Sequence, residues 1–178
     1  LARAPHIILE HRNFVKKLVF PVSILPVNPV FAALITSLFA TALYLVAAYI
    51  TKGTLYATTL LLPAIIVPQL LFTLGMCWFL AALGVYLRDL TQVMTFLLTI
   101  WFFVTPICYP ESSLPAALIP YLAQNPMFQI VRFYRMVLLE GVVPPAAAMA
   151  KLWVLAMVVF LAGHAFFRKL RRSFPDLL

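Results

Sequence analysis

The stretch WFFVTPICYPESSLPAALIPYLAQNPMFQIVRFYRMVLLEG, residues 101–141, sets the interpretation of the whole chain. It is too apolar and aromatic for an ordinary aqueous loop, yet prolines stand at positions 106, 110, 115, 120 and 126. Proline removes a backbone donor and kinks a helix, which argues against one straight transmembrane helix. In a bilayer, irregular backbone survives only where protein covers it or where it lines a cavity. We therefore expect short helices that dip into the membrane edge and fold back, beside a pathway through the protein.

The composition is that of a polytopic membrane protein. The 178 residues are 65% hydrophobic and 10% charged, and the mean hydropathy is +1.04. A soluble domain of this size does not have that balance. The net charge of +8 would suggest a nucleic-acid partner in a soluble protein, but here the lysines and arginines cluster at the ends of apolar runs. We expect an all-α protein in contact with membrane lipids and no nucleic-acid partner.

Four apolar runs are predicted to be transmembrane helices. They cover residues 29–51, 55–86, 90–108 and 145–167. Asn28 followed by Pro29 is typical of a helix start, because the side chain caps the helix and proline fits its first position. Asp89, in the charged turn Arg88-Asp89, can cap the third run.

An amphipathic helix is predicted over residues 5–20. Its apolar face consists of Ile7, Phe14, Val15, Leu18 and Val19. The polar face consists of Glu10, Arg12, Asn13, Lys16 and Lys17. Such a helix lies on a membrane surface or against a partner protein, and both possibilities remain open. Because the chain starts with Leu1 and shows no signal-peptide pattern, we expect that it is a fragment of a longer protein.

The distribution of basic residues predicts the orientation. One side of the membrane would hold Arg3, Arg12, Lys16, Lys17, Arg88, Arg168, Lys169, Arg171 and Arg172. The other side would hold Lys52, Arg132, Arg135 and Lys151. By the positive-inside rule, both ends of the chain, including the basic tail 168–178, lie in the cytoplasm, and residues 106–144 lie outside.

Two short external helices are predicted within residues 112–139. Ser113 can cap the first, and Asn125 followed by Pro126 opens the second. The second carries a polar stripe with a spacing of three, formed by Gln129, Arg132 and Arg135. The arginines either anchor the helix among lipid headgroups or meet an anionic or hydroxyl-rich substrate at a pore mouth.

Aromatic side chains concentrate near the same outer interface. They are Trp101, Phe102, Phe103, Tyr109, Tyr121, Phe128, Phe133 and Tyr134. Aromatic belts are common where membrane proteins meet the interface, which is one interpretation. Alternatively, the flat rings stack on the apolar faces of sugars and form a slippery surface suited to a long polymer.

The sequence shows no constellation typical of an enzyme. It contains no phosphate loop of the form GxxxxGK[ST], and the acidic residues all fall at predicted helix ends or in loops. Ion-coupled carriers and membrane hydrolases need buried ionisable groups or metal ligands. Cys77 and Cys108 indicate neither a disulfide framework nor a zinc site, and His164 is interpreted as a packed or interfacial side chain. We expect no catalytic residue, no metal and no cofactor in this chain.

Several ordered motifs resemble the ABC-2 type permease family, in particular the branch that exports O-antigen, capsule and teichoic-acid polysaccharides. They are YLRDLTQ (86–92), W-x-x-x-T-P-I-x-Y-P (101–110) and N-P (125–126) followed by Arg132. The opening NFVKKLVFPVSILP (13–26) resembles the family's segment before its third span, and FPDLL (174–178) resembles its usual ending. The resemblance covers essentially the whole chain.

The resemblance implies six spans per subunit, a homodimer in the bacterial cytoplasmic (inner) membrane, and separate ABC ATPase subunits that bind ATP and Mg. Two spans would then precede Leu1. Residues 5–20 would be the coupling helix, with ATPase contacts at Asn13, Lys16, Lys17, Phe20 and Pro21. Arg88 and Asp89 would lie at the cytoplasmic entrance, and the helices of 112–139 would form the external gate.

These features predict a permease that moves a lipid-linked polysaccharide with energy from its ATPase partner. The substrate pathway would include Trp101, Phe102, Phe103, Tyr109, Tyr121, Arg132, Tyr134 and Arg135. An exporter of a drug or small lipid, a membrane enzyme acting on lipid-linked sugars, and a purely structural membrane subunit are the alternatives. The lack of acids within the predicted spans argues against the enzyme.

Overall fold

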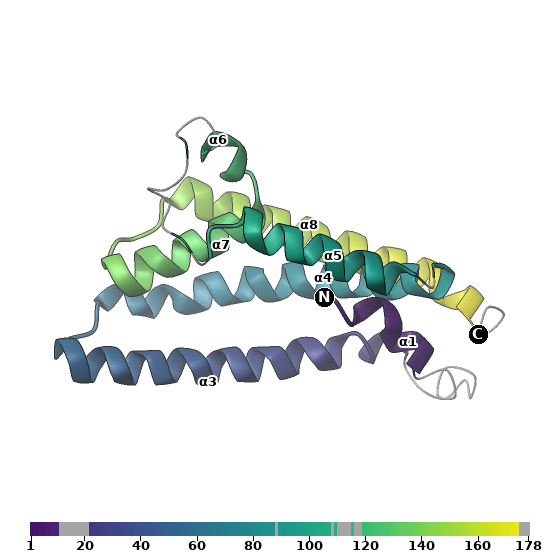
Figure 1. Cartoon of the computed structure of the whole chain (residues 1–178), viewed down its shortest axis with the longest axis horizontal. Helices are drawn as coiled ribbons and strands as arrows, with labels where there is room; N and C mark the ends of the chain where they lie inside the picture. Colours follow the sequence, from purple (N-terminus) through teal and green to yellow (C-terminus); the bar gives the residue numbers. More distant parts are fainter. Residues whose placement is uncertain (11–21, 88, 108, 110–114, 116–118, 175–178) are drawn as a thin grey trace.

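The structure is a computed structural model that describes residues 1–10, 22–87, 89–107, 109, 115 and 119–174. The described part is mainly helical and contains no strand. Its α-helices are α1 (Ile7–Glu10), α3 (Val27–Lys52), α4 (Leu62–Tyr86), α5 (Leu90–Val104), α6 (Ile119–Leu122), α7 (Pro126–Arg135) and α8 (Ala146–Leu170). Helices α3, α4, α5 and α8 run along the long axis, while α6 and α7 gather at one end (Figure 1). The prediction of an all-α protein is confirmed.

Three segments of the described chain are long and apolar enough to cross a membrane. They are Val22–Thr51, Ala57–Tyr86 and Ala146–Leu170. Helix α5 is apolar but has only 15 residues, a length of roughly 22 Å against a hydrocarbon core of about 30 Å. It ends at Val104, before the predicted boundary at 108, because Thr105 is extended (ψ 126°), as a residue that precedes proline prefers to be.

The observed starts of α3 and α5 lie close to the predicted ones, but the side chains predicted to cap these two helices do not form the caps. Helix α3 begins at Val27, and Pro26 in front of it is already helical (φ −70°, ψ −19°), so the predicted cap by Asn28 is wrong. Asp89 does precede α5, but its backbone carbonyl, and not its side chain, accepts the first hydrogen bonds. At the far end of α3, Gly53 takes the left-handed conformation (φ 70°) that ends the helix.

Helices α4 and α8 form the central pair of the bundle. A Cβ atom on Gly163 would overlap the carbonyl of Gly75, and a Cβ on Gly75 would lie 2.7 Å from the Cα of Phe160. Such close backbone approach is what small residues allow between membrane helices. At the other end of the pair, Trp153 Nε1 donates to the carbonyl of Ala64 at 3.0 Å.

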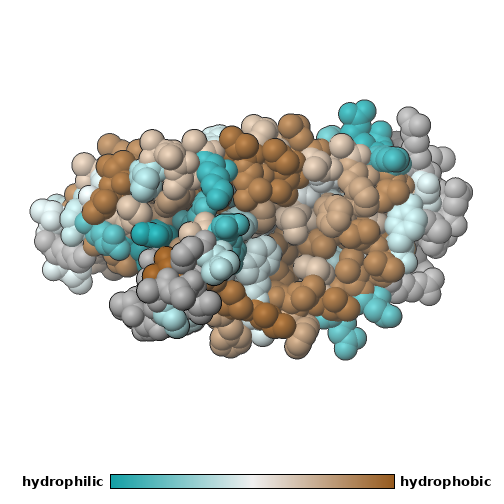
Figure 2. All heavy atoms as spheres, turned by 90° about the horizontal axis from the view of Figure 1, so that it is seen from above, coloured by the Kyte–Doolittle hydropathy of each residue, from teal (hydrophilic) through white to brown (hydrophobic). Residues whose placement is uncertain are grey.

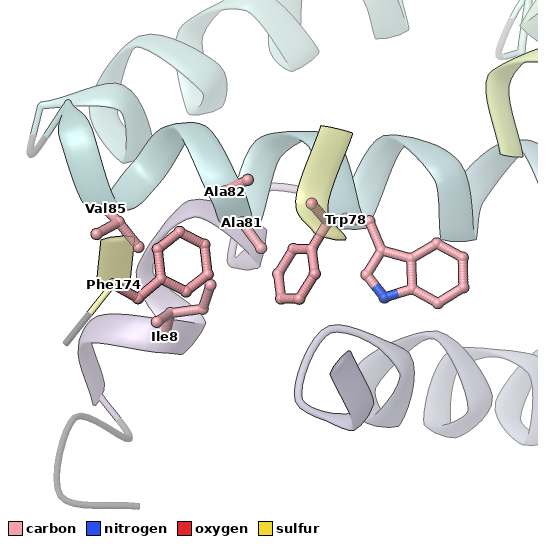
Figure 3. Close-up of a cluster of buried hydrophobic side chains, with 7 residues drawn as sticks. Ile8, Trp78, Ala81, Ala82, Val85 and Phe174 are labelled. Carbon is pink, nitrogen blue, oxygen red and sulfur yellow. The ribbon is translucent and has the colours of Figure 1, made fainter. Parts of the chain in front are cut away.

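The described N-terminal residues fold into the bundle. A 3₁₀ turn, Ala4–His6, leads into α1, and the remainder of the predicted amphipathic helix, residues 11–20, lies outside the described residues. Ala4, Pro5 and Ile8 are buried. Ile8 faces Phe174 and the end of α4, in the cluster drawn in Figure 3.

The surface has the polarity of a membrane protein. Figure 2 shows hydrophobic side chains across the middle of the molecule and hydrophilic patches toward its two ends. Helix α3 is also apolar on its exposed side, with exposed Phe31, Ile35, Phe39, Leu43 and Ile50. The chain is therefore a multi-pass membrane protein.

Candidate functional site

Helix α5 carries a row of hydroxyl groups on one face. Thr91, Thr95 and Thr99 recur every four residues, which places them one above another along the helix. Each of the two later hydroxyls donates to the carbonyl four residues earlier at 2.9 Å, as Ser and Thr do in apolar helices. The side chains of Thr95 and Thr99 are exposed. The row is therefore accessible from outside the bundle.

The row ends at an exposed aromatic pair. Phe103 continues the four-residue spacing from Thr99 and is 68% exposed, while Phe102 is 44% exposed. Their ring centroids lie 5.6 Å apart in an edge-to-face arrangement. Along this face of α5, the threonine hydroxyls are therefore followed, toward the C-terminal end of the helix, by exposed aromatic rings.

A polar pocket lies at the opposite end of the row. Its volume is about 570 Å³, and it is lined by Arg3, His6, Glu10, Asp89, Thr91 and Gln92. The pocket joins the N-terminal segment to the first turn of α5, where sequence motifs predict an entrance. Asp89 lines this pocket, and Arg88 lies outside the described residues, so the entrance at Arg88 and Asp89 stays a prediction.

Asn125 ties the far end of α5 to the start of α7. Its Oδ1 accepts from the backbone N–H of Met127 at 3.0 Å, so the predicted helix cap is confirmed. The same oxygen accepts from Trp101 Nε1 at 2.9 Å, and Asn125 Nδ2 donates to Thr105 Oγ1 at 3.3 Å. Thr105 is only 1% exposed. Asn125 is therefore both a cap and a link between two helices.

Arg135 binds the irregular backbone that follows α5. Its Nη2 donates to the carbonyls of Pro106 at 2.7 Å, Ile107 at 3.0 Å and Tyr109 at 3.3 Å. The Tyr109 hydroxyl in turn donates to the carbonyl of Phe103 at 3.0 Å, at the end of α5. Non-helical backbone at a membrane edge needs such partners, because lipid provides none. These contacts give the carbonyls of Pro106, Ile107 and Tyr109 a hydrogen-bond donor from within the protein.

The polar stripe of α7 is divided between two roles. Gln129 is buried and its Nε2 donates to the carbonyl of Ala123 at 2.6 Å, and Arg135 is partly buried against the carbonyls named above. Arg132 is exposed. For Arg132 both interpretations, a lipid anchor or a substrate contact, stay predictions.

Tyr134 joins α7 to α4. Its hydroxyl donates to Gln69 Oε1 at 2.8 Å beside a cavity of about 100 Å³ between α3 and α4. Burial raises the pKa of the Tyr134 hydroxyl above its ordinary value, so this group is a neutral donor at physiological pH. The π-helix Met136–Glu140 that follows is held by Thr58 Oγ1, which donates to the carbonyl of Val137 at 2.8 Å.

The eight predicted pathway residues thus separate into two groups. Trp101, Tyr109, Tyr134 and Arg135 make hydrogen bonds within the protein. Phe102, Phe103, Tyr121 and Arg132 are exposed, Tyr121 most of all at 76%. The predicted ATPase contacts Asn13, Lys16, Lys17, Phe20 and Pro21 lie outside the described residues, as do the first residues of the predicted gate.

Sequence reasoning missed the threonine row and the second role of Asn125. The spacing of Thr91, Thr95 and Thr99 within an apolar run was a readable signal for the row. Within the described residues, the structure shows no group of three or more His, Cys, Asp or Glu side chains that could hold a metal ion.

The chain is similar to known membrane transport proteins. Residues 1–139 match the family described as ABC-2 type transporter. The O-antigen export system permease protein RfbA of Myxococcus xanthus is 32% identical over 171 residues, which are 95% of this chain and 66% of that protein. A protein of the same name from Klebsiella pneumoniae is 24% identical over 110 residues, 62% of this chain and 42% of that protein. The chain thus spans two thirds or less of the length of these relatives. Since the family match extends over most of its length, the chain belongs to the ABC-2 type transporter family.

Proposed function

We propose that this chain is part of the permease subunit of an ATP-driven exporter that moves a lipid-linked, O-antigen-type polysaccharide across the bacterial cytoplasmic membrane. The names of the relatives from Myxococcus and Klebsiella support export of O-antigen by a permease. The observation that carries the proposal is the face of α5, where exposed hydroxyls lead from a polar pocket to an exposed aromatic pair.

The chemistry of that face suits a sugar polymer. Thr95 and Thr99 each use their hydroxyl proton within α5, which leaves oxygen lone pairs able to accept from sugar hydroxyls. The rings of Phe102 and Phe103 offer flat apolar surfaces to the carbon faces of sugars. Because Thr95, Thr99 and the two rings lie on an exposed face, successive sugars can slide along the helix.

In the proposed topology, α5 and the residues after it make a fourth crossing. Helix α5 alone is short for a bilayer, but Arg135 supplies donors to the carbonyls of residues 106, 107 and 109 and so allows non-helical backbone to continue the crossing. Both ends of the chain then lie in the cytoplasm, and α6 and α7 form the external gate. Movement of α5 would pull on α7 through Trp101 and Asn125.

Energy enters from a separate ABC ATPase subunit, which binds ATP and Mg. The chain has no phosphate loop of its own, and the predicted docking residues Asn13, Lys16, Lys17, Phe20 and Pro21 follow directly on the described N-terminal segment. We propose a homodimer in which the α5 faces of two copies line the pathway. In this arrangement the exposed apolar side chains of α5 meet a partner copy or substrate.

The test removes the hydroxyls without changing side-chain shape. In the protein's complete natural chain, expressed with its ATPase in a strain that lacks the permease, Thr95→Val combined with Thr99→Val is expected to lower surface glycan at least about fivefold. A barrier increase of about 1 kcal/mol is sufficient for that change. Surface glycan is measured by immunoblot at equal amounts of membrane-inserted permease.

The matched control lies on α3. Thr36 is exposed and Thr41 is partly buried, and the hydroxyl of each donates to the carbonyl four residues earlier. Thr36→Val with Thr41→Val is expected to leave glycan unchanged. An equal effect of both pairs would refute the α5 pathway. If the unmodified protein restores no glycan but confers export of a drug or small lipid, the rival exporter is supported instead.

A further inference from the structure

A proline lies inside α4 without ending the helix. Helix α4 runs from Leu62 to Tyr86, and Pro68 within it is fully buried. Proline has no N–H, and its ring pushes against the carbonyl of the residue four positions earlier. In α4 this residue is Ala64. Its carbonyl therefore lacks its usual helical donor, and lipid offers no replacement.

Trp153 of α8 supplies the missing donor. Its Nε1 donates to the carbonyl of Ala64 at 3.0 Å. The indole N–H is a donor alone, so this bond uses the whole hydrogen-bonding capacity of the side chain. Leu152, the neighbour of Trp153 in sequence, is fully buried, which fixes the start of α8 at the same level. The hydrogen bond thus joins the backbone of α4 to α8 at the position that Pro68 opens.

Helix α7 packs at the same level of the bundle. A buried cluster there draws on three helices. It contains Leu62 and Ile65 of α4, Ile130 and Phe133 of α7, and Leu152 of α8. Ile65 and Leu152 have no exposed surface. The position of α7 therefore depends on how the first turns of α4 and α8 are held together.

Gln69, the residue after Pro68, also contacts α7. The Tyr134 hydroxyl donates to its Oε1 at 2.8 Å. On the other side, Thr73 Oγ1 donates to the backbone carbonyl of Gln69 at 2.7 Å. Because Gln69 is one residue from the proline, a movement of the backbone at Pro68 displaces the acceptor of Tyr134.

We propose that Trp153 is a positioning residue for α7. Its indole N–H replaces the donor that Pro68 removes and so fixes the backbone of α4 at Ala64. The fixed backbone keeps Gln69 within reach of Tyr134. The inference rests on the proposed function, because α7 is there part of the external gate and its position then affects export.

The experiment asks whether Trp153 still matters once the proline is gone. Trp153→Phe keeps an aromatic ring without the N–H, and it is expected to lower the melting temperature of the complete natural chain in detergent by about 3 °C or more. Pro68→Ala returns a backbone N–H to the carbonyl of Ala64. In the Pro68→Ala background, the loss caused by Trp153→Phe is expected to be at least about twofold smaller.

Trp78→Phe is the matched control. Trp78 Nε1 also donates to a backbone carbonyl at 3.0 Å, that of Ser23, which Pro68 does not affect. The loss of melting temperature in Trp78→Phe is expected to be the same with and without Pro68. If the loss from Trp153→Phe does not depend on Pro68, or if the loss from Trp78→Phe changes as much, the inference is overturned. It is also overturned if neither Pro68→Ala nor Pro68→Ser yields inserted protein, because Pro68 then does more than remove an N–H.

A second measurement tests the connection to α7. Tyr134→Phe removes the hydroxyl that donates to Gln69. The losses of melting temperature in Tyr134→Phe and in Trp153→Phe are therefore expected to be less than additive in the double variant. Additive losses overturn the positioning role.

Export gives the functional readout. At matched amounts of inserted permease, Trp153→Phe is expected to lower surface glycan about threefold, and addition of Pro68→Ala is expected to restore most of it. Unchanged glycan in Trp153→Phe overturns the role in export. Failure of the proposed function has a different signature, because the unmodified protein itself then restores no glycan, while the melting temperatures still decide whether Trp153 and Pro68 are coupled.

Discussion

Two apolar helices, α8 and α5, are held in the molecule in different ways. Helix α8 packs on α4 along its length, with the backbones in contact at Gly75 and Gly163. Helix α5 is held mainly at its ends, by packing around Met94 at one end and by hydrogen bonds of Trp101 and Thr105 at the other. Its middle is exposed. The contrast indicates a fixed pair, α4 and α8, and a helix that can shift against it.

The largest effect is expected from placing a larger side chain in α8 and in α5 and comparing the two losses of stability. Gly163→Leu places side-chain atoms where the backbone of Gly75 already lies, and is expected to destabilise the protein by about 3 kcal/mol or more and to abolish membrane-inserted protein. Thr95→Leu, on the exposed face of α5, is expected to change stability by less than about 0.5 kcal/mol. Thermal unfolding in detergent measures both. A comparable loss at the two positions would contradict a fixed α4–α8 pair beside a loosely packed α5.

A smaller effect is expected at the outer end of α5. Arg135→Ala removes the donor from the carbonyls of Pro106, Ile107 and Tyr109 and is expected to cost about 1–2 kcal/mol, since these groups are only partly shielded from water. Arg135→Lys is expected to recover only part of the lost stability, because a single ammonium does not reproduce the planar guanidinium. The unmodified protein is the reference. Thermal stability of Arg135→Ala equal to that of the unmodified protein would show that Arg135 does not hold this segment.

The helical class and the positions of the long helices followed from the pattern of apolar runs and charged turns. The details at the helix starts did not, as the two Asn-Pro pairs show. Asn125 has an extended conformation (ψ 121°) and caps α7, whereas Pro26 is already helical, so Asn28 lies inside α3. The dipeptide is the same; the conformation of the preceding chain decides whether the cap forms.

The candidate site could be predicted by location but not by role. The three-residue spacing correctly placed Gln129, Arg132 and Arg135 on one helix, yet it could not show that two of them turn inward to backbone carbonyls. The carbonyl that Gln129 binds lies six residues earlier, in the turn before α7, and the carbonyls that Arg135 binds come from a segment distant in sequence, whose position depends on tertiary packing. Trp101 is a similar case, because its predicted role on the pathway involved its ring, while its indole N–H is used by Asn125.

The central claim is that the exposed face of α5 lines the export pathway. The two native cysteines are first removed by Cys77→Ala and Cys108→Ala. A single cysteine is then introduced at Thr95 of α5 or, as the control, at Thr36 of α3. The rate at which each cysteine reacts with a membrane-impermeant maleimide is measured in the assembled complex. If α5 lines the pathway, Thr95→Cys reacts at least about tenfold faster than Thr36→Cys, which the proposed topology places against lipid. Glycan stalled by a non-hydrolysable ATP analogue is then expected to slow the reaction of Thr95→Cys. Equal rates at both positions, or no protection by stalled glycan, would contradict the claim.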